Sequence, residues 1–166
     1  MPTKWVDDLQ KIRSIADYQF GKGVGKELFP NGVKIVYSRA TGRIRYIYLC
    51  EKRLATLRPT NGLFSLSITG AKRIMENVKP LRLWVKVKEE AEPFVKKGRT
   101  VFAKHVSDAD KEIRPMEEVI VISMEGEVLA VGKAVLTGEE MKAFKKGVAV
   151  KVRRGASEES QKRETT

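Results

Sequence analysis

Hydrophobic positions recur at helical spacing through the first twenty residues of the chain. Successive apolar residues stand three or four positions apart: Trp5, Leu9, Ile12, Ala16 and Phe20. This spacing predicts one amphipathic helix over residues 5–20, which Gly21 ends. The next stretch, GKGVGKELFPNG, is rich in glycine and loses the period, so we expect a loop there.

From Val33 the pattern changes to short runs of β-branched and aromatic residues separated by turn residues. The runs read VKIVYS, RIRYIYLC, RLATLRP and LFSLSI. Short turns between such runs predict an antiparallel meander. A helix is expected over residues 69–79, because Pro80 forbids its continuation, and RLWVKVK at residues 82–88 is expected to be the last strand of the same α+β unit.

The run EEAEP, residues 89–93, combines like charges with a proline and is the predicted domain boundary. After it come the strand-like runs TVFAKHV, VIVISM, EVLAVGKAVLT and GVAVKVR, with a turn-rich loop SDADKEIRPMEE and one short helix GEEMKAF between them. This order predicts a small Greek-key-like barrel with one helix. The expected organisation is an α+β domain, an antiparallel sheet with helices, over residues 1–92, a small β-barrel over 93–154 and a disordered polar tail over 155–166.

Charge adds an expected partner to this picture. The formal net charge of the 166 residues is +12, and residues 1–88 hold 18 basic against 6 acidic residues. Such an excess attracts polyanions, and nucleic acid is the expected one because no lipid-anchor motif accompanies it. No apolar run is long enough to span a bilayer, and acids stand where a signal peptide would be apolar, so we expect a cytoplasmic protein without a membrane partner.

The chain offers little for metal or thiol chemistry. One cysteine and one histidine exclude an internal disulfide and an all-Cys/His zinc site, and we expect no metal and no cofactor. Cys50 falls on the alternating face of Ile44, Tyr46 and Tyr48, which is typical of a buried strand face. A core thiol is therefore expected at this position.

One group of side chains could be catalytic. His105 stands close in sequence to Asp108 and Asp110, and imidazole with carboxylate can transfer protons. The alternative is that the aspartates bond backbone N–H groups of the loop and that His105 is a partly exposed strand residue. No serine, cysteine or second histidine completes a catalytic constellation, which favours this alternative.

Basic and aromatic residues are interleaved in a way that is typical of nucleic-acid binding. Cations surround Val101 and Phe102, so that edge could hold phosphates while a ring packs against a base. Arginines also recur on the predicted meander, and their planar forks suit phosphate groups. Those in the meander that we expect to bind RNA are Arg39, Arg43, Arg45 and Arg58.

The order of motifs in the second half resembles a PUA domain, the RNA-binding module named after pseudouridine synthases and archaeosine transglycosylases. Its most specific pieces are VFAK, DADKEIRP, EVLAVGKAVLTGEEM and GVAVKVR. The first half resembles the domain that precedes PUA in archaeal tRNA-guanine transglycosylases, through IADYQFGKG, TGRIR and RLATLRPTNGLFSLSITGAKRI. The catalytic barrel of those enzymes has no counterpart in these residues.

The resemblance implies a non-catalytic RNA-binding protein that holds the acceptor stem and 3′ end of a tRNA and is linked to tRNA modification. His105 stands where related sequences often carry an aromatic residue, which implies stacking. Two alternatives stay open: an RNA-binding subunit or adaptor for a separate transglycosylase or a ribosome-related complex, and a small enzyme using His105 with Asp108 or Asp110. Carried onto this chain, the RNA-binding residues of the second domain are Lys97, Gly98, Arg99, Phe102, Ala103, Lys104 and His105, with Lys133, Lys151 and Arg153 as weaker candidates.

Overall fold

The computed structural model describes residues 2–79 and 81–158 of the chain. These residues form two compact units, Met1–Pro80 and Leu81–Thr166, each with its own sheet. The fold class expected from the sequence is confirmed: an antiparallel sheet with helices, then a small barrel. The division lies about a dozen residues earlier than the boundary expected after residue 92.

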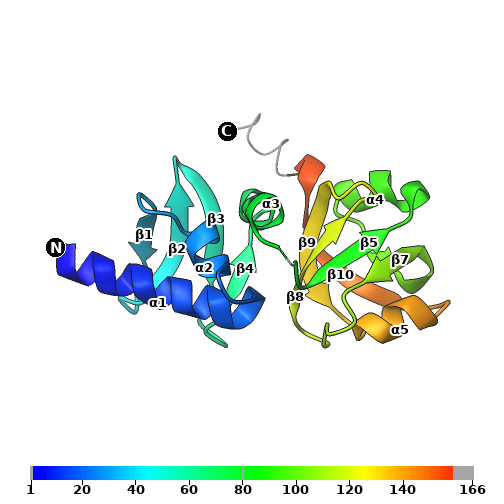
Figure 1. Cartoon of the computed structure of the whole chain (residues 1–166), viewed down its shortest axis with the longest axis horizontal. Helices are drawn as coiled ribbons and strands as arrows, with labels where there is room; N and C mark the ends of the chain where they lie inside the picture. Colours follow the sequence, from blue (N-terminus) through cyan, green and yellow to red (C-terminus); the bar gives the residue numbers. More distant parts are fainter. Residues whose placement is uncertain (1, 80, 159–166) are drawn as a thin grey trace. The chain divides into compact units, whose positions relative to one another are not determined.

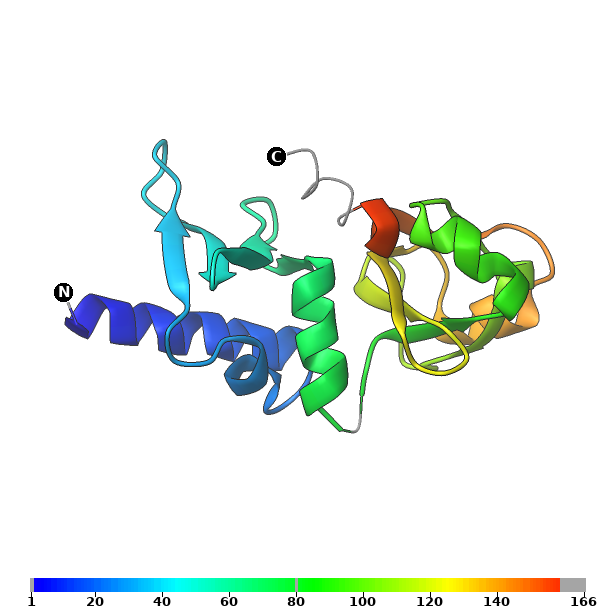
Figure 2. The same ribbon diagram turned by 90° about the horizontal axis from the view of Figure 1, so that it is seen from above.

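The first unit is a four-stranded antiparallel meander with three helices. The strands are paired in the order β1-β2-β3-β4. Helix α1 runs along the unit beside the sheet, and α3 packs against β3 and β4 (Figures 1 and 2). The elements are α1 (Pro2–Phe20), α2 (Val24–Leu28), β1 (Lys34–Tyr37), β2 (Ile44–Leu49), β3 (Lys52–Leu57), β4 (Phe64–Leu66) and α3 (Ile68–Asn77).

The core of the first unit joins α1 to the far end of the meander. The Phe29 and Phe64 rings pack with centroids 5.1 Å apart, and Ile12 and Leu54 are fully buried. The side-chain amide of Gln19 donates to the Phe64 carbonyl (2.9 Å) and accepts from its N–H (2.7 Å), which satisfies both backbone groups of an edge-strand residue. Helix α1 is thereby fixed against β4.

Two expectations for the first unit are wrong. The glycine-rich stretch after α1 contains the short helix α2, which begins after Gly23 in the left-handed conformation (φ 91°). Cys50 is exposed, because it and Glu51 form the two-residue β2–β3 turn with φ of 51° and 68°. Both residues have the positive φ that tight hairpin turns require, so the alternating pattern ends one residue before the cysteine.

The second unit is a six-stranded sheet in the order β6-β10-β9-β8-β5-β7. Its edge strands β6 and β7 are joined by a single 3₁₀ turn, η2 (Ala103–His105), and the sheet curls into a nearly closed barrel (Figure 1). The strands are β5 (Trp84–Val87), β6 (Val101–Phe102), β7 (Val106–Ala109), β8 (Glu118–Ile122), β9 (Val128–Ala134) and β10 (Val148–Gly155).

Strand β5 corrects the expected organisation, since it does not belong to the meander. It pairs parallel with β8 and antiparallel with β7. Residues 107–109, the start of the stretch expected to be loop, belong to its partner strand β7. Leu83, Val85 and Val87 are buried in the barrel core with Ile120 and Leu129.

Two helices accompany the barrel, where one was expected. Helix α5 (Gly138–Ala143) was expected and begins with a capping box between Thr137 and Glu140. Helix α4 (Glu92–Lys96) follows the 3₁₀ turn η1 (Glu89–Ala91) within the stretch expected to be a boundary. Proline is tolerated in the first turn of a helix, so Pro93 does not prevent it.

The start of the expected tail is ordered. Gly155 ends β10, and residues 156–158 are helical. The rest of the expected tail, residues 159–166, lies outside the described residues. Within the described part of the chain, no helix combines the length and the apolar character needed to cross a membrane.

Candidate nucleic-acid interface

A hollow of about 300 Å³ opens in the second unit beside helix α4 and strand β6. Its wall contains the exposed rings of Phe94 and Phe102, which keep 60% and 43% of their surface accessible. The His105 ring meets Phe102 edge to face, with centroids 6.4 Å apart. We call this site the barrel hollow; it is lined by Ala91, Phe94, Val95, Arg99, Thr100, Phe102 and His105.

The backbone around the barrel hollow is held in place by its own hydrogen bonds. The Gly98 N–H donates to the Val95 carbonyl (2.9 Å), and the Arg99 N–H donates to the Phe94 carbonyl (3.1 Å). Gly98 has φ 91°, so glycine is favoured at this sharp turn between α4 and β6. The turn brings the Arg99 side chain to the same hollow as the two phenylalanines.

Of the residues expected to bind RNA near residue 100, the structure brings Arg99, Phe102 and His105 into one site. Lys97 and Lys104 are exposed next to them in the chain. Ala103 is buried, and its N–H donates to the Gly147 carbonyl (2.9 Å), so it serves the barrel core. Phe94 also lines the hollow, and it was not among the expected residues because EEAEP, which precedes it, suggested a linker.

The carboxylates near His105 have structural partners. Asp110 accepts from the N–H groups of Leu83 (2.8 Å) and Glu112 (3.0 Å), which fixes the loop after β7. Asp108 accepts from the Ala109 N–H (2.9 Å) and pairs with Lys142 at 3.2 Å. The hydrogen bond from the Ala109 backbone is the main cause that lowers the pKa of Asp108 below its usual value, and Lys142 adds to it.

An acid with a lowered pKa is a poor proton donor near neutral pH, so Asp108 does not suit general acid catalysis. Among the described residues, no group of three or more His, Cys, Asp and Glu side chains could hold a metal ion. The two carboxylates near His105 therefore have structural roles in β7 and the loop after it.

The weaker candidates of the second unit lie on the β9 and β10 strands. Lys133 and Lys151 are register partners on these strands, and Glu118 lies opposite Lys133 on β8. The two terminal nitrogens of Arg153, Nη1 and Nη2, donate hydrogen bonds to the Glu118 carboxylate, at 2.7 and 2.5 Å. Because the Glu118 side chain is fully buried, Arg153 has a structural role in neutralising it.

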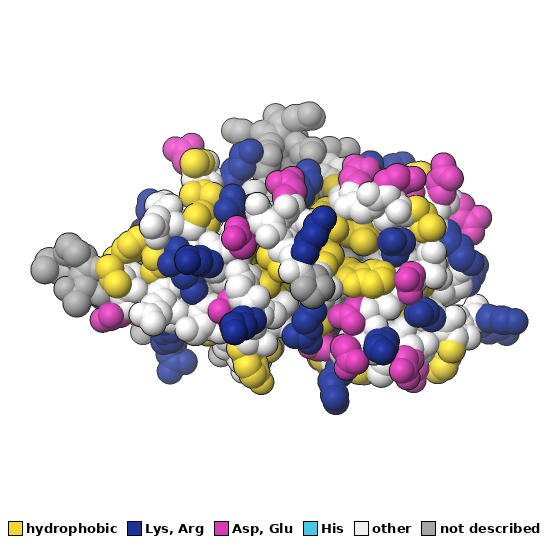
Figure 3. Space-filling view, in the orientation of Figure 1, with side chains coloured by type: hydrophobic (Ala, Val, Ile, Leu, Met, Phe, Trp, Pro, Cys, Tyr) yellow, Lys and Arg dark blue, Asp and Glu magenta, His cyan; other side chains and the backbone are white. Residues whose placement is uncertain are grey.

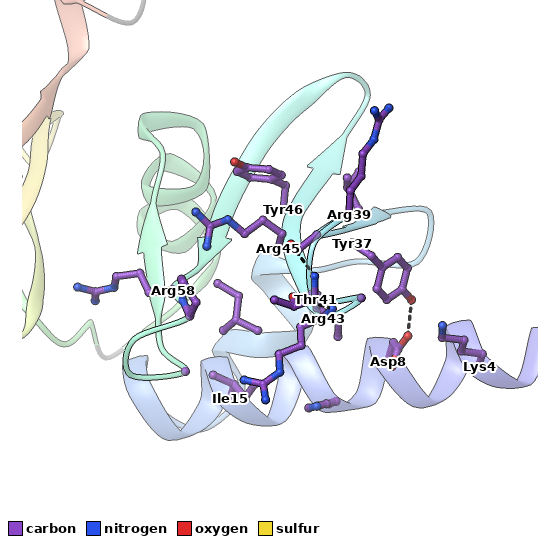
Figure 4. Close-up of a pocket in the computed structure, with 18 residues that line it drawn as sticks. Lys4, Asp8, Ile15, Tyr37, Arg39, Thr41, Arg43, Arg45, Tyr46 and Arg58 are labelled. Atoms are coloured by element: carbon purple, nitrogen blue, oxygen red, sulfur yellow. Dashed lines mark hydrogen bonds between the residues drawn. The ribbon is translucent and has the colours of Figure 1, made fainter.

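A larger hollow, of about 1050 Å³, lies in the first unit between α1 and the β1–β2 hairpin. In Figure 4 the Arg43 side chain extends from the hairpin toward α1 and ends beside Ile15, while Arg39 projects away from the helix. We call this site the meander hollow. Its 18 lining residues are Lys4, Asp8, Lys11, Ile15, Val36, Tyr37, Ser38, Arg39, Thr41, Gly42, Arg43, Ile44, Arg45, Tyr46, Leu57, Arg58, Pro59 and Gly62.

All four meander arginines expected to bind RNA line the meander hollow. Lys4 and Lys11 of α1 line it as well, and the sequence pattern could have revealed them. Lysines seven positions apart share one side of a helix, so both face the hairpin together with Asp8 and Ile15. The hollow is thus formed by residues far apart in the chain.

The single acid of the meander hollow has a partner within the hollow. The Tyr37 hydroxyl donates to the Asp8 carboxylate in a short hydrogen bond, and the Lys4 ammonium lies 4.7 Å from the centroid of the Tyr37 ring. Burial and the bond to Asp8 raise the pKa of Tyr37 to about 12. The hydroxyl therefore stays protonated at neutral pH and keeps Asp8 engaged.

The chain carries its basic excess mainly in the first unit. Residues 1–80 contain 15 basic and 6 acidic residues, whereas residues 81–166 contain 18 and 15. On the face drawn in Figure 3, acidic side chains gather mainly over the second unit. All ion pairs recorded among the described residues lie in the second unit.

A meander with helices, followed by a six-stranded barrel with two helices and an exposed aromatic hollow, defines a two-domain protein of the PUA class. Residues 10–80 match the patch-forming domain C2 of tRNA-guanine transglycosylase, and residues 84–156 match the PUA domain. The chain therefore consists of a C2 domain of the tRNA-guanine transglycosylase family followed by a PUA domain.

The chain is similar to tRNA-guanine(15) transglycosylases of archaea. The chain is 45% identical over 150 residues to the tRNA-guanine(15) transglycosylase of Methanothermobacter thermautotrophicus, which covers 90% of this chain and 23% of the relative. It is 48% identical over 144 residues to that of Thermococcus kodakarensis, covering 87% of this chain and 24% of the relative. The chain thus spans about a quarter of the length of these relatives and corresponds to their C-terminal part.

Solved structures share the fold over nearly the whole chain. A hypothetical protein of Pyrococcus horikoshii superposes with a TM-score of 0.75, at 23% identity and 94% coverage of both chains. A PUA domain protein of Thermoplasma acidophilum superposes with a TM-score of 0.68, at 20% identity, covering 95% of this chain and 93% of that one. The match to the PUA domain supports an RNA-binding role.

Proposed function

We propose that this chain is a non-catalytic RNA-binding protein whose barrel hollow holds the single-stranded 3′ end of a tRNA. The observation that carries the proposal is the convergence of Arg99, Phe102 and His105 on one exposed hollow of a PUA domain. Unpaired bases stack on aromatic rings, and guanidinium groups bind phosphates. The hollow offers both kinds of contact within one site.

The proposed mechanism divides binding between position and affinity. The turn at Gly98 and the barrel strands fix where Arg99 and Phe102 stand, so little ordering is required when RNA binds. Lys97 and Lys104, exposed beside them, neutralise phosphates of the acceptor stem without reading sequence. The basic C2 domain adds contacts to other phosphates of the same RNA.

The test is a comparison of two tRNA transcripts, one intact and one lacking its single-stranded 3′ end. Phe102→Ala should weaken binding of the intact tRNA by roughly 5- to 100-fold, the loss expected when one stacked base loses its ring. The same variant should bind the truncated tRNA as the wild type does, because the stacked base is already missing. Fluorescence anisotropy at fixed salt measures both affinities.

Two controls accompany this comparison. Met124→Ala removes another large exposed apolar side chain of the second unit, outside the hollow, and should bind like the wild type. Circular dichroism should be unchanged for Phe102→Ala. Equal weakening with both transcripts would show that Phe102 does not contact the 3′ end, and the proposed site would be wrong.

A second proposed role is that of the RNA-binding part of an assembly in which another chain performs base exchange. It is favoured by the restriction of the similarity to about a quarter of the transglycosylase relatives. Purified chain mixed with tRNA and guanine analogue should then exchange no base, and a transglycosylase should co-purify with it from cells after nuclease treatment. Base exchange by the purified chain alone would contradict both roles.

A further inference from the structure

The meander hollow combines a cationic rim with an apolar floor, a pairing that simple phosphate neutralisation does not require. Ile15, Val36 and Leu57 are only partly covered by protein and face the hollow. Exposed apolar floors in concave sites are typical of pockets that bind a flat or apolar group. A site that bound duplex phosphates alone would need only the cations.

The cations of this hollow are not neutralised by the protein. Lys4, Lys11 and the four arginines line it, and none of them forms an ion pair with a carboxylate among the described residues. The single lining acid, Asp8, is bonded by the Tyr37 hydroxyl. The net charge of the hollow therefore favours an anionic ligand.

One half-buried arginine of the hollow, Arg58, has a buried donor that the fold leaves unused. A guanidinium NH2 group of Arg58 donates to the Phe64 carbonyl (3.3 Å), whereas its buried Nε has no hydrogen-bond partner among the described residues. A buried donor without an acceptor destabilises the fold, and a ligand oxygen would remove that cost. Arg58 thus brings an unsatisfied donor to the lining of the hollow.

The hairpin that bears the arginines is preformed. The Ser38 N–H donates to the Arg43 carbonyl (2.7 Å), the Gly42 N–H donates to the Ser38 carbonyl (2.8 Å), and the Thr41 hydroxyl accepts from the Arg43 N–H (3.2 Å). Arg43 therefore starts from a fixed backbone position, from which its side chain reaches toward Ile15 (Figure 4). Preorganisation of this kind lowers the entropic cost of binding.

Aromatic and cationic side chains meet at one wall of the hollow. Arg45 and Tyr46 both line the hollow, and the Arg45 guanidinium carbon lies 5.6 Å from the centroid of the Tyr46 ring. Guanidinium planes held beside an aromatic ring can contact a base face and a phosphate in neighbouring positions. The wall therefore suits a nucleotide better than a free inorganic anion.

We propose that the meander hollow binds one unpaired nucleotide of an RNA, with its base against the Ile15 floor and its flanking phosphates on Arg43 and Lys11. This inference rests on the proposed RNA-binding function but concerns a different unit and a different part of the RNA. A looped-out nucleotide exposes one base and two phosphates, which matches the floor and rim of the hollow. Its volume of about 1050 Å³ is ample for such a group.

The experiment compares an RNA hairpin whose stem is fully paired with the same hairpin carrying one bulged nucleotide in its stem. Neither RNA has a single-stranded end. Wild-type protein should bind the bulged hairpin at least about fivefold more tightly, the lower end of one stacked-base contact. Ile15→Gln should abolish this preference while binding of the paired hairpin stays unchanged. Lys11→Gln should weaken both hairpins alike, because it removes a phosphate contact.

Matched controls exist on helices of the same unit. Val6, 51% exposed on α1, does not line the hollow, so Val6→Gln should keep the preference for the bulge. Lys72 is exposed on α3 outside the hollow, and Lys72→Gln should retain wild-type affinity for both hairpins. In the wild-type protein, a bulged 5-iodouridine should cross-link to residues of α1 or the β1–β2 hairpin, which requires no substitution.

The outcomes separate this inference from the proposed function. If tRNA binds and depends on Phe102, but Ile15→Gln keeps the bulge preference or the cross-link falls only on residues 94–105, the hollow does not hold a nucleotide. If no RNA binds the wild-type protein, the proposed function itself fails. If a free nucleoside monophosphate displaces the bulged hairpin at a concentration as low as that of the hairpin, the ligand is a small nucleotide. The RNA assignment is then wrong.

Discussion

Tyr37 and Asp8 illustrate how a single residue pair conditions the electrostatics of the meander hollow. The hydroxyl remains protonated because burial and the neighbouring carboxylate raise the pKa of Tyr37 to about 12 from 10.0. A protonated hydroxyl keeps the Asp8 carboxylate bonded within the protein. The hydrogen bond fixes the position of this carboxylate, and the surrounding lysines and arginines outweigh its single negative charge.

This raised pKa predicts a stability change in alkaline solution. The unfolded chain releases the Tyr37 proton at about pH 10 and the folded chain only at about pH 12, so the stabilising effect is complete below pH 10 and lost between pH 10 and 12. In absorbance titrations of the phenolate, one of the four tyrosines should ionise last. Asp8→Asn should lower that pKa, and Tyr37→Phe should remove the late step. A late step that persists in Tyr37→Phe would contradict the assignment.

The Glu118–Arg153 ion pair is expected to stabilise the fold of the barrel. Removing Arg153 leaves the fully buried Glu118 carboxylate without its bidentate partner, which typically costs about 3–5 kcal/mol. Arg153→Ala should therefore lower the free energy of unfolding by that order in urea titrations. Arg154→Ala, the adjacent residue on β10, is the control and should change stability by less than about 0.5 kcal/mol. Similar losses in both variants would show that the pair is not stabilising.

At the scale of elements, α5 depends on a close approach between its first residue and the loop after β7. The Gly138 N–H donates to the Ile113 carbonyl (3.1 Å), and a Cβ at residue 138 would overlap the Asp110 carbonyl oxygen. Helix α5 packs against both β7 and the η2 turn that carries Lys104 and His105. Its start is thus coupled to the geometry of the barrel hollow.

Gly138→Ala should consequently destabilise the PUA domain by about 1–3 kcal/mol, the usual cost of overpacking against rigid backbone. Glu139→Ala is the control, because Glu139 is exposed at the next position of the same helix and its replacement by alanine creates no such overlap. Thermal unfolding followed by circular dichroism measures both. An unchanged Tm for Gly138→Ala would mean that the loop moves freely away from α5.

Elements with a strong local signal were predictable from the sequence, and elements defined by long-range pairing were not. The period of α1 and the alternation of β2 gave the correct types. Strand β5 has equally clear alternation, but its parallel partner β8 lies more than thirty residues later, and no local pattern identifies that pairing. The same limit hid β7, which is a strand only because β5 supplies its hydrogen-bond partner.

Site prediction followed a similar division. The arginines of the meander and Arg99, Phe102 and His105 could be selected by residue type and resemblance, and they remain predictions as RNA contacts. Their grouping into two hollows required the fold, since α1 supplies Lys4 and Lys11 to a site otherwise built from hairpins. The buried partner of Arg153 was likewise invisible, because Glu118 is thirty-five positions away.

At the scale of the whole molecule, the two units differ in charge and in exposed aromatic surface. The C2 domain carries most of the net positive charge, whereas the PUA domain carries the exposed aromatic hollow. Each unit has its own sheet and core, so substitutions in one hollow should leave the other folded. Electrostatic contributions from the two hollows should then be separable in one titration series.

The salt dependence of tRNA affinity measures this separation. Each phosphate contact that is lost reduces the slope of log Kd against log salt by about 0.7–0.9, because fewer counterions are released. Lys11→Gln in the meander hollow and Lys104→Gln beside the barrel hollow should each reduce the slope by about one such unit, and the double variant by the sum. Lys72→Gln and Lys111→Gln, both exposed and outside the two hollows, should leave the slope unchanged. A double variant with the slope of either single variant would mean that only one unit contacts the RNA, whereas additive slopes require both domains to engage the same tRNA.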